Sequence, residues 1–149
     1  MDIKKILLCT DGEEHSDKAE KHAVMLAKIS GAELVGLYIV NPFLKKFTNE
    51  IYAVNRNECR AYLDRSLKKE GENALGVFSQ KAENEGISVI TKMKYGYPEE
   101  EIINEINEDC YDMVVMGSKL LQGWKERFES FKLPEAVIKK SPVTVLLVR

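Results

Sequence analysis

The chain has 149 residues, of which 44% are hydrophobic and 31% are charged, as expected for one globular domain. Its net charge of −2 gives no basis for nucleic-acid binding. No apolar run approaches the roughly 20 residues that span a bilayer, and the short apolar run at the N-terminus is followed by Asp11, so neither a membrane segment nor an export signal is expected.

Short apolar runs alternate along the chain with segments of helical periodicity. Strands are predicted where an apolar run is closed by turn residues, and helices where apolar residues recur every three or four positions. Gly31 and Gly86 close two of the helices, and Pro98 with three following glutamates opens another. In chain order the prediction is a strand over 3–9, a helix over 14–29, a strand over 33–40, a loop or short irregular helix over 42–55, a long amphipathic helix over 57–85, a strand over 88–93, a helix from residue 98, a strand over 113–116, a helix over 131–140 and a strand over 144–148.

This alternation predicts one α/β domain over residues 1–149. Strands separated by helices form a parallel sheet with helices on both faces. The ligands of such sheets bind at the carboxyl ends of the strands, where the strand order reverses. The candidate ligand-binding turns are therefore residues 10–12, 39–41, 96–98 and 117–118.

Four segments carry a family pattern, in order and at matching spacing. They are KKILLCTDGEEHSDKAEKHAVMLAK, ELVGLYIV, GYPEEEIINEINEDCYDMVVMGS and VIKKSPVTVLLVR. Through them the chain resembles the universal stress protein family over its whole length. The resemblance implies a Rossmann-like fold with a five-stranded parallel sheet in the order 3-2-1-4-5, and usually a dimer.

Members of that family that bind ATP resemble one another in a loop of the form Gly-x-x-Gly, nine residues, then Gly-Ser or Gly-Thr. Glycines allow backbone N–H groups to approach the phosphates closely. Gly117 matches the first glycine, but Leu120 stands at the second position and Ser130 or Phe131 at the third. The resemblance therefore implies a stress-response protein with weak or absent ATP binding.

The other parts of the family's nucleotide site are present. Asp11 matches the aspartate near the ribose and adenine, and Ile39 matches the residue whose backbone meets the adenine. Gly96 and Pro98 match the turn beside the pocket, and Gly117-Ser118 matches the start of the phosphate loop. The resemblance makes these residues the candidate site for ATP or AMP with Mg²⁺, without firmly implying a cofactor. Asp11 can alternatively cap the first helix, and the two roles are compatible.

Two features of the segment after Ser118 leave alternatives open. Its basic side chains either are solvated or hold phosphates in place of the missing glycines, which would make the protein an ATP-binding stress protein with slow hydrolysis. Its aromatic side chains either fill the phosphate region or cover a partner surface. The basic residues are Lys119, Lys125, Arg127 and Lys132, and the aromatic residues are Trp124, Phe128 and Phe131.

The sequence offers no clear set of residues for catalysis or for metal binding. His15 and His22 lie seven positions apart without a nearby pattern of carboxylates or cysteines, which favours surface histidines. Ser118 lacks the flanking glycines of a nucleophile elbow. The three cysteines are widely spaced and typical of a reduced, cytoplasmic protein. We therefore expect a regulatory protein with at most slow ATP hydrolysis.

The last strand is the expected contact with a partner. In the order 3-2-1-4-5 it lies at a sheet edge, where unpaired backbone groups invite further pairing. We therefore expect a homodimer through Val143 to Val148, and in addition an unidentified protein partner. No nucleic-acid or membrane partner is expected.

Overall fold

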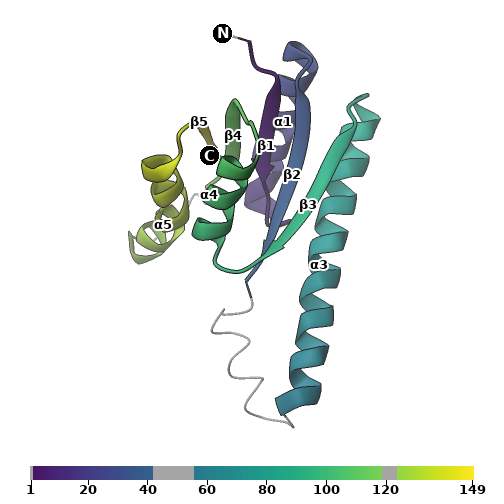
Figure 1. Cartoon of the computed structure of the whole chain (residues 1–149), viewed down its shortest axis with the longest axis vertical. Helices are drawn as coiled ribbons and strands as arrows, with labels where there is room; N and C mark the ends of the chain where they lie inside the picture. The colour runs from purple at the N-terminus through teal and green to yellow at the C-terminus, as the bar shows by residue number, and fades with distance from the viewer. Residues whose placement is uncertain (1, 42–55, 119–123) are drawn as a thin grey trace.

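The structure is a computed structural model that describes the backbone of residues 2–41, 56–118 and 124–149 and the side chains of residues 2–41, 62–118 and 132–149. The loop or irregular helix predicted over 42–55 lies outside these ranges. Within them, no helix is long and apolar enough to cross a membrane. Strands and helices alternate as shown in Figure 1: β1 Lys5–Cys9, η1 Glu14–Ser16, α1 Asp17–Ser30, β2 Glu33–Val40, α3 Arg56–Asn84, β3 Val89–Tyr95, α4 Pro98–Glu108, β4 Met113–Gly117, α5 Trp124–Lys140 and β5 Thr144–Val148.

The strands form a parallel sheet in the order β3-β2-β1-β4-β5, which confirms the predicted fold class and strand order. β1 is the central strand, and Cys9 at its end lies opposite Leu37 of β2 and Met116 of β4. The carboxyl ends of three strands therefore meet in the middle of one sheet edge. The strand order reverses between β1 and β4, which is where such sheets bind ligands.

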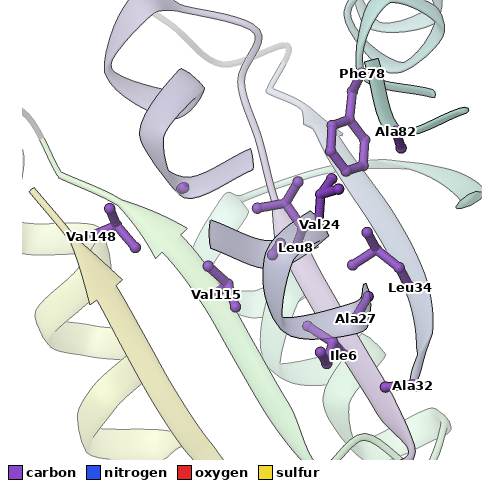
Figure 2. Packing of buried hydrophobic residues seen from close by; sticks show 12 residues of the cluster. Ile6, Leu8, Val24, Ala27, Ala32, Leu34, Phe78, Ala82, Val115 and Val148 are labelled. Atoms are coloured by element: carbon purple, nitrogen blue, oxygen red, sulfur yellow. The ribbon is translucent and has the colours of Figure 1, made fainter. Parts of the chain in front are cut away.

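Helices α1 and α3 cover one face of the sheet, and α4 and α5 cover the other (Figure 1). Successive side chains of a strand point to opposite faces, so β1 contributes to both halves of the core. Ile6 and Leu8 pack with α1 and with Phe78 of α3, which is fully buried (Figure 2). Leu7 packs on the other face with Ile102 of α4. Burial of each such side chain contributes roughly 1.5–3 kcal/mol to folding.

A buried carboxylate also joins α4 to the sheet. Glu105 of α4 is 2% exposed, and its Oε1 atom accepts hydrogen bonds from Lys92 Nζ at 2.7 Å and from the Tyr111 hydroxyl at 2.8 Å. Lys94 Nζ lies 3.2 Å from the other carboxylate oxygen. Burial alone would raise the pKa of Glu105, but the hydrogen bonds from these three groups outweigh it and lower that pKa.

The last helix begins earlier than predicted. α5 starts at Trp124 rather than near Phe131, and Pro134 lies inside it. Proline favours the first turn of a helix, which is where Pro134 would lie in the predicted helix over 131–140. The helix instead tolerates the loss of one backbone hydrogen bond to the carbonyl group four residues earlier. The predicted start of this helix at residue 131 is therefore wrong, while the other described elements occur where predicted with ends that differ by a few residues.

Candidate functional site

A cavity of about 1040 Å³ opens at the carboxyl ends of β1, β2 and β4. Residues of α1 and α3 border it on one side of the sheet, and residues of α4 and α5 border it on the other. It occupies the place predicted for a ligand. Most of the candidate site residues line it, namely Asp11, Ile39, Pro98, Gly117 and Ser118.

Gly96 is the candidate residue that does not line this cavity. Its N–H group donates a hydrogen bond to the carbonyl oxygen of Val40 at 3.0 Å. This bond ties the end of β3 to the end of β2 just before Pro98 begins α4. Gly96 therefore contributes to the turn that brings Pro98 to the cavity.

Asp11 holds the turn between β1 and η1. Its Oδ1 atom accepts hydrogen bonds from the backbone N–H of Glu13 at 2.9 Å and from the Ser16 hydroxyl at 2.8 Å. The residue that caps α1 is Ser16, whose side chain makes no capping bond. Asp11 thus stabilises the entry into the helical segment without capping α1 directly. Its side chain is 48% exposed, so a ligand can also reach it.

The buried side chain of Glu20 stabilises the turn between β1 and η1 through Thr10. The Thr10 hydroxyl donates to Glu20 Oε1 at 3.1 Å and accepts from the Gly12 N–H at 3.1 Å, while Lys81 Nζ lies 3.4 Å from the other oxygen of Glu20. Burial raises the pKa of Glu20, and the contacts with Thr10 and Lys81 offset this only in part. This role of Glu20 was not predicted from the sequence. Its position on the same helical stripe as the buried residue Ala23 was the available signal.

The same turn places His15 between two carboxylates. Its Nε2 atom lies 2.8 Å from Asp11 Oδ2, and its Nδ1 atom lies 3.4 Å from Glu13 Oε2. The prediction of surface histidines fits His22, which is exposed on α1, whereas the His15 side chain is only 19% exposed. The carboxylates around His15 were not anticipated, because they meet it only when the chain reverses at Gly12.

Two positions at this site require glycine because neighbouring atoms leave no room for a side chain. Gly12 has a φ of +74°, and a Cβ atom at this position would lie 2.7 Å from the Cβ of Ala74 in α3. A Cβ at Gly117 would lie 2.7 Å from the carbonyl oxygen of His15. The end of β4 is therefore packed directly against the turn that carries Asp11.

Ser118 follows Gly117 and is 4% exposed. Its N–H donates to the carbonyl oxygen of Val148 at 2.9 Å, which ties the end of β4 to β5. Its Oγ atom is buried and has no hydrogen-bond partner among the residues that the structure describes. A buried hydroxyl without a partner is unfavourable, so this atom is a natural contact for a bound polar group.

The phosphate side of the site differs from a glycine loop. Leu120, at the second glycine position, lies outside the described residues. Ser130 and Phe131, the two alternatives for the third position, lie within α5. A backbone engaged in helical hydrogen bonding cannot turn its N–H groups inward as a glycine loop does.

Among the described side chains that line the cavity, carboxylates are the most frequent charged groups. The basic side chains of this described lining are Lys81 and His15. An anion without a counterion would be repelled here, whereas a neutral nucleoside or a cation would not. The carboxylates that line the cavity are Asp11, Glu13, Asp17, Glu20 and Glu70.

The comparisons with known proteins agree over the whole chain. A model of the universal stress protein family matches residues 2–149. Universal stress protein MJ0531 of Methanocaldococcus jannaschii is 32% identical over 148 residues, which cover 98% of this chain and 82% of that protein. The solved structure of universal stress protein UspA from Lactobacillus plantarum has a TM-score of 0.79 at 20% identity, covering 100% of this chain and 99% of its own.

A further solved structure is a complex with a nucleotide. It is the universal stress protein from Archaeoglobus fulgidus in complex with dAMP, with a TM-score of 0.68 and 16% identity over the full length of both chains. At this identity the likeness concerns the fold alone. Taken with the family match over residues 2–149 and the identity to MJ0531, these findings show that the chain belongs to the universal stress protein family.

Proposed function

We propose that this universal stress protein is a regulatory protein whose cavity accepts the adenosine part of an adenine nucleotide and binds ATP weakly or not at all. The observation that carries the proposal is the location of Ser130 and Phe131 inside α5, where a third loop glycine would be needed. With Leu120 at the second position, the phosphates lose most of the close backbone approach that glycine permits.

The adenosine side of the cavity supports the other half of the proposal. Ile39 and Pro98 present apolar groups to the cavity, and Asp11 offers a carboxylate oxygen that can accept a hydrogen bond from a sugar hydroxyl. Ser118 offers a buried hydroxyl on the same cavity. An aromatic base with one or two oriented hydrogen bonds suits a site of this kind. The dAMP complex of the Archaeoglobus fulgidus protein is consistent with a nucleotide that has few phosphates.

The alternative function is an ATP site in which lysine and arginine side chains replace the loop glycines. Lys132 is the first residue of α5 whose side chain is described, and it is exposed. The side chains of Lys119, Lys125 and Arg127 lie outside the described residues. A calorimetric titration with MgATP distinguishes this alternative from the function proposed above.

Calorimetric titration of the purified protein with adenosine, AMP and MgATP tests the proposal. We expect a dissociation constant for MgATP weaker than about 100 μM, which corresponds to less than roughly 5.5 kcal/mol of binding. Adenosine or AMP should bind at least as well as MgATP. Micromolar binding of MgATP, or ATP that remains bound through purification, would favour the lysine-substituted site instead.

We expect the protein to catalyse at most a slow hydrolysis of ATP. Cys9 is a potential nucleophile at the cavity, but burial raises the pKa of its thiol to about 12, with a further contribution from Glu105. The thiol therefore stays protonated and unreactive at neutral pH. Release of inorganic phosphate from MgATP, followed over hours, should not exceed a slow background turnover.

We also propose a homodimer through the last strand, Val143 to Val148, and a cytoplasmic location. β5 lies at the edge of the sheet and pairs with β4 on one side. Its second edge is available for a two-fold contact with another copy. The described cysteines, Cys9 and Cys110, are free thiols, which suits a reducing compartment.

A further inference from the structure

Three potential metal ligands converge at the rim of the cavity. Asp11, Glu13 and His15 each offer one ligand atom, and these atoms all lie within 4.8 Å of one another. We propose that these three residues form a binding site for a divalent transition-metal ion, such as Mn²⁺ or Zn²⁺, that does not require a nucleotide. Two carboxylates and an imidazole are a ligand set that both ions accept.

The distances are close to those of a coordination sphere. Ligand atoms about 2.1 Å from an ion are at most about 4.2 Å apart. The closest pair, His15 Nε2 and Asp11 Oδ2, is 2.8 Å apart, so both fit around one ion. Glu13 Oε2 lies 3.4 Å from the other ring nitrogen of His15, Nδ1, so this side chain, which is 57% exposed, has to turn towards the Nε2 side to complete the site.

The structure also orients two of the ligands. Asp11 uses Oδ1 to accept hydrogen bonds from the Ser16 hydroxyl and the Glu13 N–H, which leaves Oδ2 directed towards His15. The backbone of His15 is held by its contact with Gly117 at the end of β4. Hydrogen bonds that fix a carboxylate in this way raise the affinity of metal sites, because less side-chain freedom is lost on binding.

Two further observations at the same cavity favour a bound cation. The carboxylates of Asp17, Glu20 and Glu70 add negative charge that the single lysine of the described lining, Lys81, does not neutralise. Ser118 presents a buried Oγ atom without a partner among the described residues, on the same cavity. A metal ion with its bound water would supply both positive charge and a hydrogen-bond donor.

An ion bound at this site would also change how strongly the cavity repels phosphate groups. Without an ion, the acidic rim repels phosphate groups. With one, the charges of Asp11 and Glu13 are neutralised at the turn that packs against Gly117, so the rim repels phosphate groups less. This consequence rests on the proposed nucleotide function, whereas metal binding itself does not.

The test uses the full chain without an affinity tag, because a histidine tag would bind metal. Mn²⁺ alone is titrated and free Mn²⁺ is followed by electron paramagnetic resonance, and Zn²⁺ alone is titrated by calorimetry. Mn²⁺ avoids thiolate ligands, so its binding excludes the cysteines as the site. We expect one ion per chain, with Zn²⁺ binding more tightly than Mn²⁺.

Paired variants locate the site. Glu13→Gln and His15→Asn should each weaken Mn²⁺ binding at least tenfold. Glu14→Gln, in the neighbouring position, and His22→Asn, at the other histidine, should change the Mn²⁺ affinity by less than twofold.

Circular dichroism checks that each variant is folded. Glu13→Gln keeps the test valid if the histidine variant is unstable, because Glu13 is exposed. Absence of stoichiometric Mn²⁺ and Zn²⁺ binding up to 1 mM (about 4 kcal/mol of binding), or equal losses in the control variants, would overturn the proposal. Neither result depends on whether a nucleotide binds.

Discussion

Tyr111 and Lys92 donate hydrogen bonds to the same carboxylate oxygen of Glu105, at 2.8 Å and 2.7 Å. Tyr111 lies in the connection between α4 and β4, and Lys92 lies on β3, an edge strand of the sheet. Glu105 therefore connects α4 to β3 and to the segment that leads into β4 through one buried group. Because Pro98 at the start of α4 lines the cavity, this connection also fixes one wall of the candidate site.

Replacing Glu105 with glutamine should destabilise the fold strongly. Removal of one partner from a buried ion pair typically costs 3–5 kcal/mol, and we expect about 3 kcal/mol because Lys92 keeps 36% of its side chain exposed to water. Urea denaturation measures the loss. The matched control is Glu108→Gln, which removes an exposed carboxylate that also pairs with Lys94 and should cost less than about 1 kcal/mol. Similar losses in the two variants would contradict the central role of Glu105.

The contribution of Glu105 should disappear in acid. Its pKa is lowered in the folded protein, so the ionised carboxylate stabilises the fold above its unfolded pKa of about 4.3. This stabilisation is lost as the pH falls through the lower folded-state pKa. The difference in free energy of unfolding between wild type and Glu105→Gln should therefore be constant from pH 6 to pH 8 and narrow as the pH falls below about 4.3. If the difference in free energy of unfolding stays unchanged down to pH 3, the substitution destabilises the protein through packing and not through loss of charge.

Asp11→Ala should weaken binding of whichever of adenosine and AMP binds to the wild type. Loss of a hydrogen bond to a charged group predicts a decrease of about 1–3 kcal/mol in binding free energy, measured by calorimetry. The variant also loses the hydrogen bonds to Ser16 and to the Glu13 N–H, so its melting temperature is recorded alongside. Glu14→Ala is the control, since Glu14 lies in the same turn and is not among the residues that line the cavity. Equal affinities of Asp11→Ala and wild type would remove Asp11 from the site.

Val145→Lys should dissociate the proposed dimer. The substitution places a charge in the edge strand, where a lysine disfavours pairing with another strand. Light scattering should report a fall from twice the chain mass to the 17.0 kDa of one chain. Val145 is partly buried against the α4 and α5 side of the core, so circular dichroism must confirm that the variant is folded. Ile90→Lys, on the opposite edge strand β3, should leave the mass unchanged, and a monomeric wild type at micromolar concentration would count against the dimer.

The strands were predictable because their signals are local. The runs around Leu7, Val35 and Val114 are apolar on both faces and end at turn residues, which is the pattern of buried parallel strands. The positions of Asp11, Ile39 and Pro98 at the cavity followed from the same pattern, because parallel strands bring their carboxyl ends together.

The features that were not predicted depend on tertiary contacts, on the geometry of a turn or on the length of a helix. Glu20 and Glu105 look like ordinary charged residues of amphipathic helices, and only the packed structure brings Thr10 and Lys92 to them. The start of α5 was misplaced because Pro134 is a strong local signal that the rest of the helix overrides. In each case a tertiary contact or a longer helical run decided the outcome, and neither is visible in a short window of sequence.

The contact between Gly12 and Ala74 limits how this protein could acquire new ligands. A larger residue at position 74 would press on the turn that carries Asp11, and shortening it to glycine would still leave Gly12 with a φ of +74° that favours glycine alone. Position 74 can therefore change little without loss of the turn. Divergence in ligand preference is expected instead at cavity-lining residues outside the core, such as Val77 of the same helix, which is 56% exposed.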